Sequence, residues 1–168
     1  MLSASLLAAA LAVMPDMSAP DTAGGMHQAA IGAGIEERLG ERVDPSLPFL
    51  NERGERVTLE RYLNLGRPIL LNFSYFHCPM LCGLVQDGMA KALRQLDGVP
   101  GRDYELLTVS MDWREGPDEA LPVKERIVPD LNKPGAEDGW HFLTGDYKSV
   151  RALARSVGFH YNFVPGQN

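Results

Sequence analysis

The run "PILLNFSYF", residues 68–76, constrains the fold of this chain more than any other segment. It is apolar, rich in aromatic residues and as long as a single strand, which is typical of a central strand buried on both faces of a sheet. From Gly83 to Leu96 the apolar period becomes that of a helix. The predicted buried face of this helix consists of Val85, Met89, Ala92, Leu93 and Leu96. A buried strand that leads into a helix begins a strand–helix–strand unit and predicts an α/β fold.

Later segments continue this alternation. We predict a second buried strand at 104–112, a third strand at 140–146 and a helix at 146–159, with Thr144 or Asp146 as the helix N-cap. The order of strands and helices predicts a sheet with crossover connections.

Two other segments carry turn and breaker residues. Short apolar stretches on both sides of Asn51–Gly54 predict an N-terminal β-hairpin with a glycine-containing turn. Four prolines lie between Trp113 and Gly139, and they leave room for only a short or broken helix at about 119–128.

Length and charge restrict the class of protein. The chain has 168 residues, of which 45% are hydrophobic and 23% charged, as expected for one soluble domain. Its net charge of −6 and the lack of a Lys or Arg cluster argue against a nucleic-acid partner.

The N-terminus differs from the rest of the chain. Residues 1–14 are apolar and fit the hydrophobic region of a secretory signal better than a membrane span, although no Lys or Arg precedes Arg38. Residues 15–30 are small, polar and rich in Gly and Pro. We therefore expect a leader and linker at 1–30, a domain at 31–168, and export of the protein.

Both cysteines, Cys78 and Cys82, lie in "CPMLC" at the head of the predicted helix. A helix N-terminus stabilises a thiolate, which redox chemistry and metal binding both require. The sulfurs of a disulfide lie about 2 Å apart, whereas two sulfurs on one metal ion need about 4 Å. The CxxxC spacing therefore favours a metal without excluding a disulfide. Two thiolates favour Cu(I), whereas Cu(II) or Zn(II) would also require an imidazole.

Three segments carry a resemblance to a known family. They are "LGERVDPSLPFLNERGERVTLERYLNLGRPILLNFSYFHCPMLCGLV", "GWHFLTGD" and "ALARSVGFHYNFVPGQN". Over residues 34–168 the chain resembles the Sco/SenC copper chaperones. The resemblance implies a thioredoxin-like fold, export to the periplasm or a tether on the outer face of the inner membrane, and copper binding, as Cu(I) or Cu(II), by Cys78, Cys82 and a distant histidine. It also implies delivery of copper to the binuclear centre of cytochrome c oxidase. The implied partners are the copper-bearing subunit of that oxidase, other copper carriers and thiol oxidoreductases.

The family's histidine has no counterpart in this sequence. The resemblance places it after the segment that matches residues 159–168, together with two strands and a helix. We therefore expect the third ligand, and the completion of the domain, beyond Asn168.

The histidines within the chain are weaker candidates. His77 adjoins Cys78 and is better placed to tune its thiolate than to bind a metal. The side chain of His141 is expected to be packed or solvent-facing, and His160 precedes the family's ligand loop. His27 lies in the linker. Another candidate, Asp112, would either pair with Arg114 or have a functional role, lining the site or a partner surface.

Two functions remain open from the sequence. The first is a copper carrier with Cys78 and Cys82 as ligands. The second is a thiol–disulfide reductase that keeps a partner's cysteines reduced for metallation, with Cys78 as the attacking thiolate. A carrier requires a third ligand, whereas a reductase requires only two thiols.

Overall fold

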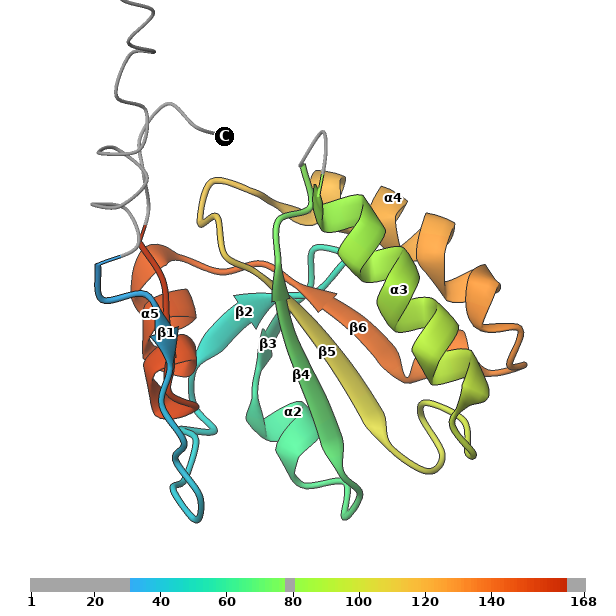
Figure 1. Ribbon diagram of the computed structural model, residues 1–168, viewed down its shortest axis with the longest axis horizontal. Coiled ribbons are helices and arrows are strands. Elements are labelled where there is room, and N and C mark those ends of the chain that lie inside the picture. Colours follow the sequence, from blue (N-terminus) through green and yellow to red (C-terminus); the bar gives the residue numbers. More distant parts are fainter. Residues whose placement is uncertain (1–30, 78–80, 163–168) are drawn as a thin grey trace, which may run out of the picture.

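A parallel three-stranded sheet forms the centre of the computed structural model, which describes residues 31–77 and 81–162 (Figure 1). Its strands are β4 (Ile69–Ser74), β5 (Glu105–Ser110) and β6 (Trp140–Leu143), in the order β4-β5-β6. Every residue of β5 is buried, as expected for the middle strand of a parallel sheet. The predicted α/β fold and the three predicted strands are confirmed.

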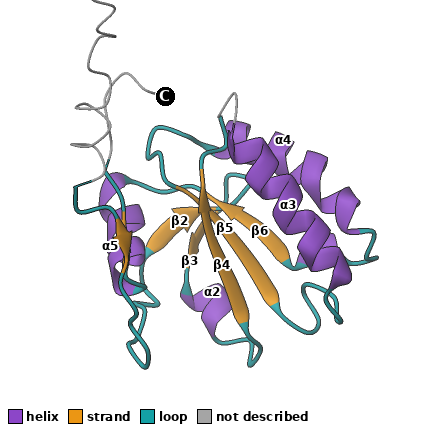
Figure 2. Ribbon diagram, viewed as in Figure 1, coloured by secondary structure: helices purple, strands orange, loops and turns teal. Residues whose placement is uncertain are grey.

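Helices and the hairpin cover the two faces of this sheet. The helices α3 (Leu81–Gln95) and α4 (Pro117–Ile127) lie on one face, and α5 (Tyr147–Ser156) and the hairpin lie on the other (Figure 2). Successive side chains of a strand point to opposite faces. Accordingly, Leu106 of β5 packs in the core beneath α3 and α4, whereas Leu107 packs in the core beneath α5. Each face thus has its own apolar core.

The predicted hairpin is confirmed as β2 (Pro48–Leu50) paired antiparallel with β3 (Arg56–Thr58). The Asn51 side-chain oxygen accepts the N–H groups of Arg53 at 3.0 Å and Glu55 at 2.9 Å, which closes the turn. Gly54 has a φ of +78°, a left-handed conformation that favours glycine. The short helix α2 (Glu60–Leu63) follows the hairpin.

A second small sheet was not predicted. It pairs β1 (Gly34–Ile35) with β7 (Phe159–His160), which follows α5. The ring of Phe159 stacks on Phe73 of β4 with centroids 4.9 Å apart. The end of the described chain therefore packs on the strand that leads into the cysteine motif.

The helix predicted at about 119–128 is present as α4, but the expectation that the prolines would shorten or break it is wrong. The helix α4 runs unbroken over Pro117–Ile127, and a 3₁₀ helix, η1 (Val128–Leu131), continues it. Pro117 is in the first turn, where a missing N–H costs nothing. Pro122 lies inside α4. Because the carbonyl that it leaves without a helical partner belongs to the exposed Asp118, water can satisfy that oxygen.

The predicted buried face of α3 is also wrong in part. Met89 and Leu93 contact the core as expected, whereas Val85, Ala92 and Leu96 are exposed. The buried face instead includes Ala90 and the polar Gln86. The remaining predicted helix is confirmed as α5, and Asp146 is its N-cap because its carboxylate accepts the Ser149 N–H at 2.8 Å.

The described part of the chain has no helix of the length and apolarity that a membrane span requires. The leader and linker predicted at 1–30 lie outside the described residues.

A buried ion pair joins α4 to the hairpin turn. The amino group of Lys124 lies 2.5 Å from Glu52, whose other carboxylate oxygen accepts the Phe142 N–H at 3.2 Å. Burial by itself would raise the pKa of Glu52, but the hydrogen bonds and charge of Lys124, with the backbone N–H groups, outweigh it and lower that pKa. The ionised pair therefore connects three separate segments of the fold.

We predict that Glu52→Gln destabilises the domain at pH 7 by about 3–5 kcal/mol, because it leaves Lys124 buried without a counter-charge. The folded pKa of Glu52 is lowered, so its stabilising effect is present above the unfolded pKa and is lost as the pH falls through the folded pKa. Urea denaturation should show the difference between wild type and Glu52→Gln shrinking at acid pH. The control is Glu125→Gln, at an exposed position of α4. Equal stability of the two variants would contradict the prediction.

Candidate metal centre

The described segments on both sides of residues 78–80 lie at the carboxyl edge of the sheet, where β4 ends at Ser74 and α3 begins at Leu81. Cys82 is the second residue of α3 and is half-buried. The N–H groups of a first helical turn have no partner within the helix, and the helix dipole is positive there. Cys82 is thus placed where a thiolate is stabilised. Cys78 lies outside the described residues.

Gln86 connects α3 to the end of β4. It lies one turn after Cys82 and is 1% exposed. Its side-chain N–H₂ donates to the Ser74 hydroxyl at 2.9 Å and to the Tyr75 carbonyl at 3.4 Å. Its oxygen accepts a hydrogen bond of 3.0 Å from Arg126 of α4. Because a buried polar group is costly unless it is bonded, this amide fixes the helix against the strand end.

Glu115 also binds the segment between β4 and α3, from the loop that follows β5. This half-buried residue lies between β5 and α4. Its carboxylate accepts the Phe76 N–H at 3.0 and 2.9 Å, the His77 N–H at 2.6 Å and the hydroxyl of Ser110. The two residues before Cys78 are therefore bonded to a loop at the end of the neighbouring strand.

The sequence analysis identified neither Gln86 nor Glu115 as part of this region. A polar residue between apolar positions of α3 was the available signal for Gln86. Nothing in the local pattern marks Glu115, because its contacts depend on β4 and β5 being neighbours.

The histidines at 141 and 160 interact with carboxylates. The Nε2 atom of His141 lies 3.3 Å from Glu105, and its ring packs on Tyr62 with centroids 4.6 Å apart. Burial lowers the pKa of His141 because it disfavours the charged ring, despite the nearby carboxylates. The Nε2 atom of His160 lies 3.4 Å from Glu36. Of the two arrangements expected for His141, packed or solvent-facing, the structure has the packed one.

The side chain of His77, next to the motif, is exposed. In residues 31–77 and 81–162, no cluster of three or more His, Cys, Asp or Glu side chains has the arrangement of a metal site. His27 lies outside the described residues, as does Cys78.

Asp112 forms the ion pair that was one of its two expected roles. Its carboxylate is 2.5 Å from the Arg114 guanidinium, and the Arg114 N–H donates to it at 2.9 Å. The hydrogen bond from the Arg114 side chain lowers the pKa of Asp112 below its usual range. This pair makes the loop that carries Glu115 compact.

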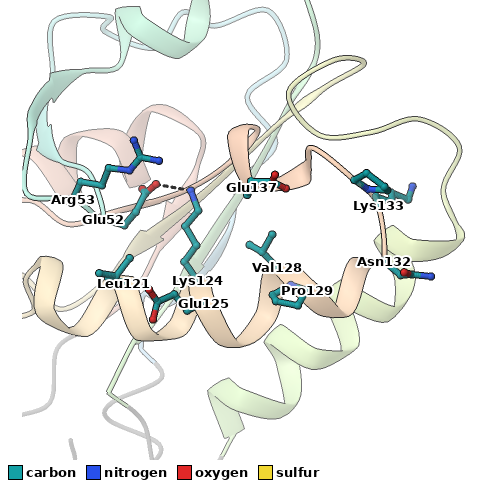
Figure 3. Close-up of a pocket in the computed structure, with 11 residues that line it drawn as sticks. Glu52, Arg53, Leu121, Lys124, Glu125, Val128, Pro129, Asn132, Lys133 and Glu137 are labelled. Atoms are coloured by element: carbon teal, nitrogen blue, oxygen red, sulfur yellow. Dashed lines mark hydrogen bonds and ion pairs between the residues drawn. The ribbon is translucent and has the colours of Figure 1, made fainter.

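A separate pocket of about 580 Å³ lies between α4, η1 and the hairpin turn. Figure 3 shows Lys124 reaching across it to Glu52, with Leu121, Val128 and Pro129 among its lining residues. Among the described residues, Cys82 does not line this pocket, whose lining comes from the hairpin turn, α4, η1 and the residues that follow it.

Comparison with known proteins identifies the family. The model of the SCO1/SenC family matches residues 36–168, which is most of the chain. The chain belongs to the SCO1/SenC family. The resemblance drawn from the sequence is thus confirmed. A comparison of this SCO1/SenC chain with curated proteins gives no match.

Solved structures have the same fold. A candidate electron transfer protein from Aquifex aeolicus VF5 has a TM-score of 0.62 and 22% identity over 76% of this chain and 77% of its own. Copper-bound ScoI from Bradyrhizobium japonicum has a TM-score of 0.57 and 19% identity, covering 76% and 74%. BsSco, a Sco family cytochrome c oxidase assembly protein with a disulfide switch, has a TM-score of 0.51 and 23% identity, covering 73% and 67%. The thioredoxin-like α/β fold expected for this SCO1/SenC chain is confirmed.

We predict that Gln86→Met destabilises the domain by about 1–3 kcal/mol, because it removes the bonds to Ser74 and Arg126 while nearly keeping the side-chain volume. Chemical denaturation measures this change. The matched control is Gln95→Met, at an exposed position of the same helix, which should leave the free energy of unfolding within about 0.5 kcal/mol. The same small loss in both variants would show that the buried amide does not stabilise the junction.

Proposed function

We propose that this SCO1/SenC protein is a copper carrier that delivers copper to the binuclear centre of cytochrome c oxidase. Copper is its cargo, and the thiolates of Cys78 and Cys82 are the proposed ligands. One observation carries the proposal: Cys82 lies in the first turn of a helix behind a parallel strand, in a family whose solved members include copper-bound ScoI.

The local structure suits a soft cation. The positive end of α3 favours the deprotonated thiols that copper requires. Two thiolates satisfy Cu(I), which tolerates low coordination, and an imidazole would extend the site to Cu(II). Transfer to a partner would proceed by exchange of ligands: the bonds from copper to the two thiolates would break as bonds to the partner's ligands form, and the oxidation states of copper and sulfur would not change.

The proposed third ligand is a histidine other than His141 or His160. Their side chains interact with Glu105 and Glu36, on elements other than α3. His77 adjoins the motif and is the internal alternative, because its exposed ring is beside Cys78 in the sequence.

The proposed partner and location follow from the family and from the sequence. BsSco is described as a cytochrome c oxidase assembly protein, which supports the copper-bearing subunit of that oxidase as the partner. The apolar residues 1–14 support an exported leader, and residues 15–30 a linker before the domain at 31–168. The net charge of −6 would speed association with a basic docking surface.

A second function, thiol–disulfide exchange, is favoured by the disulfide switch of BsSco. In this reaction the Cys78 thiolate attacks a partner disulfide and releases one partner thiolate. Cys82 then attacks the mixed disulfide, which frees the second partner thiolate. The partner gains two electrons, and the chain retains a Cys78–Cys82 disulfide.

We predict that the fully reduced chain binds one Cu(I) ion in an anaerobic titration against a chromophoric chelator. Cys82→Ser should lose stoichiometric binding, since one thiolate cannot hold the ion alone. A parallel Cu(II) titration tests for an imidazole. Tight Cu(II) binding that is lost in His77→Ala would identify His77 as the third ligand. Failure of the reduced wild type to bind Cu(I) would refute the carrier function.

The exchange reaction has its own test. We predict that Cys78→Ser abolishes reduction of a model disulfide, whereas Cys82→Ser still attacks and accumulates a mixed disulfide, because it lacks the resolving thiol. Mass spectrometry distinguishes the two variants. Mixed disulfide on Cys78→Ser in place of Cys82→Ser would reverse the roles of the two cysteines.

A further inference from the structure

The pocket between α4, η1 and the hairpin turn has a charged pair in its wall that neither the copper chemistry nor the thiol chemistry uses. Its volume of about 580 Å³ lies in the range of sites that bind small molecules. Lys124 and Glu52 line it, and both residues are more than nine-tenths buried. Because desolvating two charges costs free energy, an ion pair that faces a cavity in this way marks a candidate ligand site.

The rest of the pocket wall is largely apolar. Leu121 of α4 is 38% exposed, and Val128 and Pro129 continue the apolar surface at the start of η1. Figure 3 shows Leu121 on one side of Lys124 along this helical wall, with Val128 and Pro129 on the other. A hydrocarbon group lying there would remove this apolar surface from water, which favours its binding.

The hairpin end of the pocket has hydrogen-bond donors to spare. The ammonium group of Lys124 has three N–H donors, and among the described residues it donates only to Glu52. Figure 3 shows Arg53 beside Glu52. Within residues 31–77 and 81–162, the Arg53 guanidinium forms no hydrogen bond or ion pair, although its backbone N–H donates to Asn51 at 3.0 Å. Glu52 balances one of the two cations, so this end of the pocket has one net positive charge.

The opposite end of the pocket is fixed by Lys133. Its amino group donates to the carbonyls of Leu96 at 2.5 Å and Gly98 at 2.6 Å, just after α3. The preceding residue, Asn132, has a φ of +52°, a left-handed conformation that asparagine adopts more readily than most residues. Its N–H donates to the Pro129 carbonyl at 3.0 Å. The walls are thus held before a ligand enters, which lowers the entropic cost of binding.

Two further carboxylates restrict the charge of the ligand. Glu125 and Glu137 also line the pocket, and both are exposed. They would repel a second anionic group on the ligand, because placing like charges together is costly. The pocket therefore favours a ligand with one carboxylate over a ligand with two.

We propose that this pocket binds a small monocarboxylate with an apolar body. The carboxylate accepts hydrogen bonds from Arg53 and Lys124. The body covers the apolar wall formed by Leu121, Val128 and Pro129. This binding function is separate from the copper and thiol chemistry and does not depend on it. The C-terminus of a peptide offers the same two groups, so a peptide probe is needed to distinguish the two sources.

The first probe is octanoate, titrated into the whole chain by isothermal calorimetry. We expect one saturable site with a Kd at or below about 1 mM, within the usual free energy per atom for a ligand of about ten non-hydrogen atoms. Octanamide has the same body without the charge, and it should bind about tenfold more weakly because it loses the charge-assisted hydrogen bonds. Suberate should also bind more weakly than octanoate, because its second carboxylate meets Glu125 and Glu137.

The matched variants are Arg53→Gln and Arg155→Gln. Both positions are exposed, but only Arg53 lines the pocket, whereas Arg155 lies on α5. Arg53→Gln should weaken octanoate binding about tenfold and leave octanamide binding within about twofold of wild type, so the preference for the charged probe disappears. Arg155→Gln should change neither affinity. A variant that is merely misfolded would lose both probes equally, so the comparison separates recognition of the carboxylate from structural damage.

Nuclear magnetic resonance locates the bound probe. Octanoate should shift the backbone amide signals of residues 52–53 and 121–134. Absence of saturable octanoate binding, equal affinity for octanoate and octanamide, or shifts confined to another surface would overturn the proposal. Tighter binding of N-acetyl-leucyl-leucine than of octanoate would overturn the assignment to a small molecule. None of these results bears on the proposed copper function, which the Cu(I) titration tests separately.

Discussion

The burial of β5 on both faces is the constraint on which the rest of the structure depends. A parallel strand cannot be joined to its neighbour by a tight turn, so each connection crosses over the sheet and carries a helix. The carboxyl ends of β4 and β5 consequently meet at one edge. That edge brings the motif after β4 next to the loop after β5, although the two are distant in sequence. The placement of Glu115 beside the motif follows directly from this topology.

Polar side chains at the two ends of the parallel sheet have different hydrogen-bond partners. At the amino end, Glu105 is 1% exposed and is bonded to Arg67 at 2.7 Å, with His141 on its other side. At the carboxyl end, the carboxylate of Glu115 binds mainly backbone N–H groups. At the amino end, pairs of side chains therefore join neighbouring strands. At the carboxyl end, the Glu115 side chain binds the backbone between β4 and α3 directly.

Much of this architecture could be predicted from the sequence because the signals are local. The apolar run at 68–76, the helical period after it and the Asp146 cap each depend on neighbours in the chain. Where prediction failed, distant contacts decided the outcome. The rule for proline does not foresee that α4 is unbroken, because Pro122 is tolerated once the affected carbonyl is exposed. The buried face of α3 was misassigned because Gln86 is buried by its bonds to Ser74 and Arg126. Cys82 could be placed at a helix start, but the bonds from Phe76 and His77 to Glu115 could not be foreseen, because they depend on β4 and β5 being neighbours.

The pairing of β1 with β7 has a consequence for the order in which the fold opens. These strands have two residues each, and they join segments from the two ends of the described chain, so their closure carries a large entropic cost. They are expected to separate at a much lower free energy than β5, as a local opening of the native state. Such an opening separates the ring of Phe159 from that of Phe73 and exposes the outer edge of β4 to water. The strand that leads into the cysteines would thus exchange its amide protons sooner than the strand beside it.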